Sequence, residues 1–214
     1  MAKREEKLYS IEEAISKIKA QKTKFDATVE VHINLLKDKK QEMNVRYTTT
    51  LPQGTGKTKK VAVLASKKVP NADLELMEED LEKIEKGKLK PRVDFDVFIS
   101  EPKFMPKIAK VARVLGPVGM MPNPKTGTVT EDVEEAVNQV KKGKIEVRTE
   151  KDVPVIHTLI GKHSFTNEQL LENYKELMQS LKQNRPAKSP LNWIKSVFLC
   201  TTMGKSVQVD LNAQ

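Results

Sequence analysis

The residues most suggestive of catalysis lie in Gly54-Thr-Gly-Lys-Thr58, which contains the second half of a phosphate-binding loop. A complete loop of this kind needs another glycine five positions before its second one, where the backbone bends around the phosphate. That position is Leu51, and residues 59–64 after the motif predict a strand where a helix should begin. We therefore interpret Gly54 and Gly56 as parts of a hinge, and a nucleotide-binding α/β enzyme that uses residues 54–58 is the disfavoured alternative.

Other reactive side chains are few. The chain has one cysteine, Cys200, and three histidines, His32, His157 and His163. Because the histidines are scattered along the sequence, they predict neither a metal-ligand cluster nor a catalytic triad, and a single cysteine forms no internal disulfide. We expect no metal, no cofactor and no catalytic residue, so the protein is not expected to be an enzyme.

The charge of the chain favours binding to a polyanion. The 38 Lys and Arg residues outnumber the 29 Asp and Glu residues, which leaves a net charge of +9 over 214 residues. Cations at predicted strand ends and loops would neutralise phosphates; they are Lys22, Lys24, Arg46, Arg148, Lys151, Lys162 and Lys205. Aromatic residues make up 5% of the chain, too few for stacking successive bases, so a structured RNA is the better partner. A DNA-binding protein would need a basic recognition helix, which the mixed-charge helices do not supply.

Both ends of the chain predict helices and antiparallel strands. Ser10 and Glu13 form a capping-box pattern before a helix, and residues 166–169 repeat it before a second helix. Alternating residues 25–33 and 44–51 predict a hairpin that places Phe25 on the core face, and residues 195–201 and 207–211 predict another around the 202–204 turn. Each end therefore contributes a helix followed by two strands.

The middle of the chain has a different pattern. Residues 61–65 are continuously apolar, which is typical of a strand buried on both faces. Predicted helices at 73–86, 102–115 and 131–142 alternate with this strand and with a strand at 93–99, as in a parallel α/β unit. The fold class is therefore α/β and α+β. An antiparallel α+β domain of residues 1–56 plus 144–214 is interrupted by a Rossmann-like α/β domain at residues 57–143, with Gly143 completing the hinge.

Nothing in the sequence predicts a membrane protein. No apolar run approaches the roughly 18 residues that a bilayer span needs, and the charged N-terminus does not have the pattern of a signal peptide. We expect a cytoplasmic protein.

Several segments together resemble the large-subunit ribosomal protein L1 family of bacterial type. The longest is Leu115-Gly-Pro-Val-Gly-Met-Met-Pro-Asn-Pro-Lys-Thr-Gly-Thr-Val-Thr130, which follows the family's signature loop. Further matches are Lys24-Phe-Asp-Ala-Thr-Val-Glu-Val-His32, Gly161-Lys-His-Ser-Phe165 and Thr201-Thr-Met-Gly204. The resemblance extends over nearly the whole chain.

This resemblance implies a structural protein of the large ribosomal subunit that binds 23S rRNA at the mobile stalk near the tRNA exit site. It implies assistance in the release of deacylated tRNA, contact with other ribosomal components, and repression of translation through the protein's own mRNA. The family's RNA-contact positions fall on Phe25, Thr202, Met203 and Gly204. Weaker candidates are Lys24, Glu30, Arg46, Arg148, Lys151 and Lys162.

Overall fold

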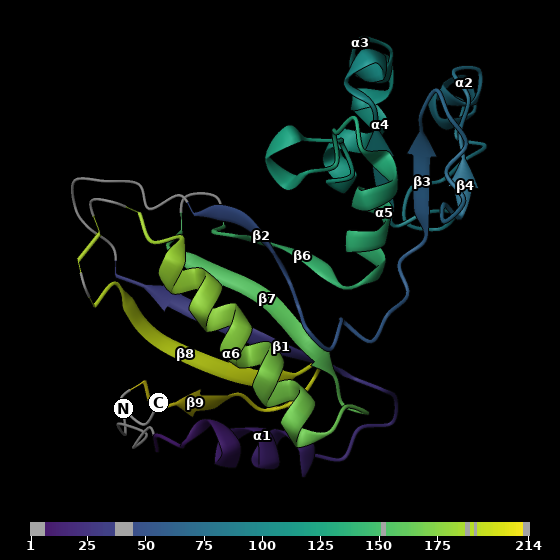
Figure 1. Ribbon diagram of the computed structural model, residues 1–214. Coiled ribbons are helices and arrows are strands. Elements are labelled where there is room, and N and C mark those ends of the chain that lie inside the picture. The colour runs from purple at the N-terminus through teal and green to yellow at the C-terminus, as the bar shows by residue number, and fades with distance from the viewer. Residues whose placement is uncertain (1–6, 37–44, 151–152, 187–188, 191, 212–214) are drawn as a thin grey trace. The chain divides into compact units, whose positions relative to one another are not determined.

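The computed structural model of the chain describes residues 7–36, 45–150, 153–186, 189–190 and 192–211. Backbone contacts divide the chain into two compact units, which are described separately (Figure 1). We call Met1–Gly56 with Ile145–Gln214 the terminal unit, and Lys57–Lys144 the middle unit. The chain is a mixture of helix and sheet and contains an antiparallel sheet. No helix in the described ranges has the length and apolar composition needed to cross a bilayer.

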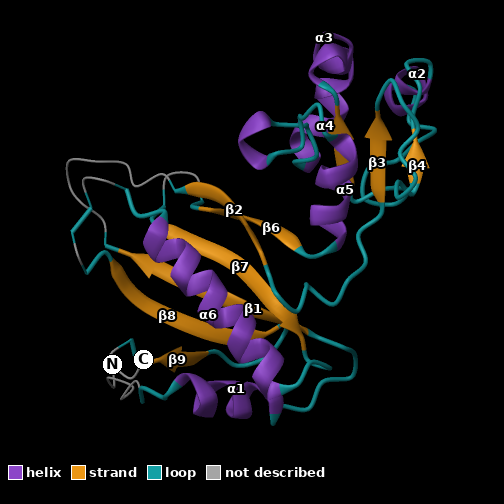
Figure 2. Cartoon of the chain, viewed as in Figure 1, coloured by secondary structure: helices purple, strands orange, loops and turns teal. Residues whose placement is uncertain are grey.

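A four-stranded antiparallel sheet forms the centre of the terminal unit (Figure 2). Its strands follow the order β7 (Val155–Lys162), β1 (Thr28–Leu35), β8 (Ile194–Thr201) and β9 (Val207–Val209). A separate pair consists of β2 (Arg46–Thr50) and β6 (Lys144–Arg148). The helices are α1 (Ile11–Lys19) and α6 (Asn167–Gln183). The unit thus joins strands from both ends of the sequence in one sheet.

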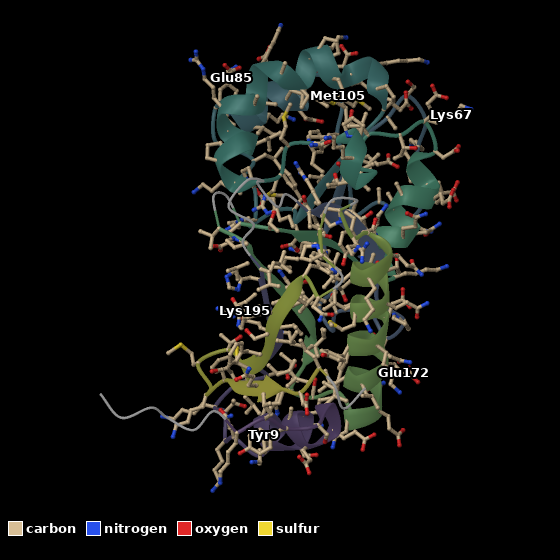
Figure 3. All side chains as sticks on the ribbon, turned by 90° about the vertical axis from the view of Figure 1, so that its left-hand side faces the viewer. Tyr9, Lys67, Glu85, Met105, Glu172 and Lys195 are labelled. Atoms are coloured by element: carbon tan, nitrogen blue, oxygen red, sulfur yellow. The ribbon has the colours of Figure 1, made fainter. Side chains whose placement is uncertain are left out.

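Side-chain alternation along β1 gives the sheet a buried face. Val29, Val31 and Ile33 are buried in one core with residues of both helices, and α6 crosses this face (Figure 1). Figure 3 shows α6, which carries Glu172, and β8, which carries Lys195, on opposite sides of the unit. The intervening residues of β1 are only half-buried, so the second face of the sheet remains partly open to solvent.

Two predictions for this sheet are wrong. The strand at 44–51 does not form a hairpin with the first strand, because β2 pairs with β6, and the expected turn at residues 37–40 lies outside the described residues. The sequence pattern also predicts no strand at Val155–Lys162, although β7 pairs along almost the whole of β1. Pairing between segments more than 100 residues apart has no local sequence signal.

The middle unit contains a parallel sheet of order β4 (Leu74–Glu75), β3 (Val61–Leu64) and β5 (Val97–Ser100). All four residues of β3 are buried, which confirms the predicted buried strand. Ala62 and Leu64 pack with α2 (Asp80–Glu85) and α4 (Ala112–Val118), whereas Val61 and Val63 pack with α5 (Val133–Lys141). Apolar residues therefore cover both faces of this sheet.

Two helices of the middle unit are shorter than predicted. The segment after Asp73 begins with β4, because backbone bonds to Val61 and Val63 hold it against the sheet. The predicted helix at 102–115 is divided into η1 (Pro102–Phe104), α3 (Met105–Ile108), η2 (Ala109–Val111) and α4. Pro106 lacks the N–H that would continue a helix from the residues before it, so α3 begins beside it. A further short helix, η3 (Pro124–Thr126), lies in the proline-rich loop.

The buried side chain of Asn173 holds the loop after β2 against α6. Its Oδ1 accepts from the Gln53 N–H at 3.0 Å, and its Nδ2 donates to the carbonyls of Gly54 at 3.0 Å and Ile160 at 2.7 Å. Asn173 is fully buried, so its side-chain amide takes the place of water as a hydrogen-bond partner of these three backbone groups.

The turn between β8 and β9 is fixed from two sides. The Gly204 N–H donates to the Thr201 carbonyl at 2.7 Å, and Met203 has a φ of 68°. Positive φ at the third residue is the pattern of a type II turn. From the segment just after α1, the Gln21 side chain accepts from the Lys205 N–H at 2.7 Å and donates to the Lys205 carbonyl at 2.9 Å. These bonds confirm the predicted hairpin and fix the position of its turn.

Asn173→Ala should lower the free energy of unfolding by roughly 2–4 kcal/mol, because it removes a hydrogen-bond partner from the buried Ile160 carbonyl and from two partly buried backbone groups at Gln53 and Gly54. Chemical denaturation measures the change. Lys175→Ala, at an exposed position on the same helix, serves as the control and should change stability by less than about 0.5 kcal/mol. Equal effects of the two substitutions would contradict the importance of the amide.

Gly204→Ala should destabilise the chain by roughly 1–3 kcal/mol. A Cβ at this position would lie 2.1 Å from Thr201 Oγ1 and 2.6 Å from Gln21 Oε1, so the turn or its partners must move. Thermal and chemical denaturation test this expectation. Lys205→Ala is the matched control, since Gln21 contacts only the backbone of Lys205; a stable Gly204→Ala protein would show that the turn adapts freely.

Candidate nucleic-acid interface

Three strand termini meet at one end of the four-stranded sheet. Thr28, at the start of β1, is opposite Lys162 at the end of β7, and Val29 is opposite Thr201 at the end of β8. The register therefore brings together residues from widely separated parts of the sequence. We call Phe25, Glu30, Lys162 and residues 202–204 the sheet-end cluster.

The two large apolar members of this cluster are exposed. Met203 is 93% exposed and Phe25 is 53% exposed. The sequence pattern placed Phe25 on the core face, and this is wrong because the strand begins at Thr28. Simple core packing is therefore excluded for both residues. Exposed Met203 also has positive φ, a conformation that is uncommon for residues other than glycine and often marks functional sites.

Thr202 links the turn to β1. Its N–H donates to the Thr28 carbonyl at 2.9 Å, and its hydroxyl donates to Glu30 Oε1 at 2.8 Å. The Thr202 side chain is partly exposed. A carboxylate repels phosphate but accepts hydrogen bonds from ribose hydroxyls and base N–H groups. This end of the sheet is thus suited to sugars and bases as well as to phosphates.

The cations near this end differ in their environments. Lys162 Nζ donates to Thr28 Oγ1 at 3.0 Å and to the Asp26 carbonyl at 3.3 Å, so it joins β7 to the residues before β1. Lys24 and Lys22 are exposed in the loop before β1, and Lys205 is exposed after the turn. These three ammonium groups are the more accessible ones for an anionic ligand.

Sequence reasoning missed the side chains that support this loop. The Asp26 carboxylate accepts from the Ser164 N–H at 3.0 Å and from its hydroxyl at 3.1 Å. Gln21 holds the backbone of Lys205, as described above. All of these contacts join distant segments, so no local spacing signals them.

Arg46 and Arg148 do not belong to the sheet-end cluster. Both lie in the β2–β6 pair, and bonds between Val45 and Thr149 place them at the same end of it. Thr149 forms a bridge with Ile156 near the start of β7, whereas Lys162 ends that strand roughly 20 Å away at the usual rise per residue. The cations that the sequence places at strand ends and loops therefore do not all gather at one end of the four-stranded sheet.

The two arginines also have different partners. Arg46 Nε donates to Glu146 Oε1 at 2.7 Å in a partly exposed ion pair, whereas Arg148 is exposed at the end of β6. The remaining predicted contact, Lys151, lies outside the described residues.

Two of the three histidines, His32 and His157, lie beside Cys200, contrary to the sequence prediction that these residues are scattered. On the half-open face of the sheet, His32 Nδ1 lies 2.6 Å from His157 Nδ1, and His32 Nε2 lies 3.1 Å from Cys200 Sγ. Burial lowers the pKa of His32, His157 adds to the decrease, and Glu30 opposes it. Burial and the Glu30 carboxylate raise the pKa of the Cys200 thiol. The imidazole of His32 and the thiol are therefore neutral at neutral pH.

The three glycines that the sequence predicts as a hinge adopt a positive φ, which favours glycine over other residues. Gly54, Gly56 and Gly143 have φ values of 69°, 72° and 105°. A Cβ on Gly56 would lie 2.6 Å from Lys162 Cγ and 2.9 Å from a ring carbon of Phe165. The next element after residues 54–58 is strand β3, as the sequence predicts. A phosphate-binding loop would instead lead into a helix.

Comparison with known proteins identifies the relatives of the chain. A model described as the ribosomal protein L1p/L10e family matches residues 16–205. A relative named large ribosomal subunit protein uL1 from Prochlorococcus marinus strain MIT 9312 is 45% identical over 217 residues, covering 98% of this chain and 90% of the relative. The protein of that name from Mesoplasma florum is 44% identical over 214 residues, covering 97% of this chain and 92% of the relative.

These matches confirm the resemblance inferred from the sequence motifs. The shared length leaves no large part of the terminal or middle unit outside the comparison. The chain belongs to the ribosomal protein L1p/L10e family.

Proposed function

We propose that this chain is a structural component of the large ribosomal subunit, and that its terminal unit binds a folded segment of large-subunit (23S) rRNA. Family membership supports the ribosomal role, because the relatives are named large ribosomal subunit proteins. The observation that carries the RNA site is the 93% exposure of Met203 in a positive-φ turn. A large apolar side chain held in this way stabilises no core, but it can pack on a ribose or a base.

The sheet-end cluster offers several kinds of contact to RNA. Phe25 supplies an aromatic surface, and Thr202 with Glu30 supplies hydrogen-bonding groups for 2′-hydroxyls. Gly204 lets a ribose approach the backbone closely. The exposed Lys24 neutralises phosphate, whereas Lys162 mainly fixes the loop because its ammonium group already has two partners. Arg46, Arg148 and Lys151 would reach a second segment of the same RNA.

The proposal assigns a different role to the middle unit. We regard it as an inserted Rossmann-like domain that moves on its two connections to the terminal unit, which contain the predicted hinge glycines Gly54, Gly56 and Gly143. Asn173 fixes Gly54 to the terminal unit, and side chains of that unit surround Gly56. Asp96 accepts from the Lys60 N–H at 3.2 Å within the middle unit. Bending is therefore proposed between these anchors, at residues 56–59.

The chain passes between the two units twice, at residues 56–57 and at residues 144–145. Within the middle unit, a hydrogen bond joins these two connecting segments. Lys59 Nζ donates to the Lys144 carbonyl at 3.0 Å, and burial is the main cause of its lowered pKa. We propose that the two connections move together. Such motion would accompany release of deacylated tRNA at the exit site of the ribosome. Contacts with other ribosomal components, and repression of translation through the protein's own mRNA, complete the proposed role.

Met203→Ala should weaken binding to an RNA fragment that carries the rRNA stalk by roughly 1–2 kcal/mol, the usual cost of losing one desolvated contact. Met203→Gly should have the same effect while removing the positive-φ strain, so neither variant should lose thermal stability. Affinity is measured by salt titration beside an unrelated RNA duplex, because nonspecific phosphate contacts weaken steeply with salt.

The matched control is Met77→Ala, since Met77 is 74% exposed in the middle unit. It should leave the affinity for the stalk fragment unchanged. The RNA site would be wrongly assigned if Met77→Ala weakened binding as much as Met203→Ala, or if the unmodified chain bound both RNAs equally well.

A further inference from the structure

Four side chains with metal-binding atoms converge on the half-open face of the sheet. Glu30 and His32 are on β1, His157 is on β7, and Cys200 is on β8. The register places His32 opposite His157 and Glu30 opposite Cys200. The chain has only one cysteine and three histidines, so the cysteine and two of the histidines meet in one place.

The distances fit a single small cation. His32 Nε2 lies 3.1 Å from Cys200 Sγ and 3.8 Å from Glu30 Oε2. One ligand atom each from Glu30, His32 and Cys200 lies within 4.8 Å of the other two. Zinc binds nitrogen, oxygen and sulfur at about 2.0–2.3 Å in tetrahedral sites, so its ligand atoms are roughly 3–4 Å apart. Small rotations of these side chains would therefore complete three corners of a tetrahedron.

The neighbouring groups leave the required atoms available. The Thr202 hydroxyl donates to Glu30 Oε1 at 2.8 Å, which leaves the other carboxylate oxygen, Oε2, toward His32. His32 Nδ1 is paired with His157 Nδ1 at 2.6 Å, so a proton between these two nitrogens leaves the Nε2 lone pair toward the thiol.

A carboxylate lies close to His157 on the side away from His32. Its Nε2 lies 3.6 Å from Glu150 Oε1, and its ring meets that of His32 edge to face with centroids 4.7 Å apart. Histidines that bind metals usually donate their second ring N–H to a fixed acceptor, which orients the ring. The arrangement from Glu150 through His157 to His32 provides that support.

We propose that Glu30, His32 and Cys200 form a binding site for Zn²⁺, with His157 as a positioning residue. Thiolate, imidazole and carboxylate together suit this borderline-soft cation better than Mg²⁺ or Ca²⁺, which prefer oxygen ligands. Binding forms a bond from zinc to Cys200 Sγ and releases the thiol proton to solvent. Three protein ligands leave a fourth position for water or another oxygen ligand. Glu30 is shared with the sheet-end cluster, but the zinc site needs no RNA and can be tested without it.

Zinc binding is tested on the metal-stripped full chain by competition with a chromophoric chelator. We expect one zinc ion per chain, and Co²⁺ in its place should give the charge-transfer absorption of a thiolate ligand. Cys200→Ser should abolish that absorption and weaken zinc binding at least about 100-fold, and His32→Gln should weaken it similarly. His157→Gln should weaken binding by about 10–100-fold while keeping the thiolate absorption, as expected for a positioning residue.

The matched control is His163→Gln. His163 is the third histidine and contacts the Lys19 carbonyl through Nε2, away from the site. This variant should bind zinc as the unmodified chain does, and circular dichroism verifies that each variant is folded. The proposal is overturned if the unmodified chain binds zinc no more tightly than Cys200→Ser, if the cobalt form has no thiolate absorption, or if His163→Gln weakens binding as much as His32→Gln.

Discussion

The pairing of β1 on both of its edges is the constraint on which the terminal unit depends. β1 lies between β7 and β8, and both partners come from the other side of the middle unit in the sequence. Their hydrogen bonds satisfy the backbone of β1, and the resulting register determines which side chains share each face. The core beneath α6, the sheet-end cluster and the group around His32 all follow from that register.

Local patterns predicted much of the fold. The capping box at Thr166 and Gln169 is present at the start of α6, and the turn at residues 202–204 joins β8 to β9 as predicted. The buried strand β3 was also recognisable from continuous apolar residues. In each case the signal and the structure it specifies lie within a few residues of each other.

The failures involve contacts between distant segments. Alternation identified β2 as a strand but did not reveal that its partner is β6. The same alternation assigned Phe25 to the core, because a sequence pattern does not mark the residue at which pairing begins. His32, His157 and Cys200 looked unrelated for the same reason, since only the register of three strands brings them together. The resemblance to a family identified Phe25 and Met203 as candidate RNA contacts, which the residue pattern alone did not do.

The arrangement of the terminal unit has a consequence for its synthesis. Between the end of β1 and the start of β7 the ribosome must add roughly 120 residues, which takes about 6–24 s at ~5–20 residues per second. Throughout that interval both edges of β1 have no strand partner from the sheet, and the middle unit, which is continuous in sequence, is completed only at Lys144, near the end of the interval. The nascent chain therefore holds Val29, Val31 and Ile33 without their final core until β7, α6 and β8 have followed the middle unit, and an unpaired apolar strand of this kind is prone to aggregation.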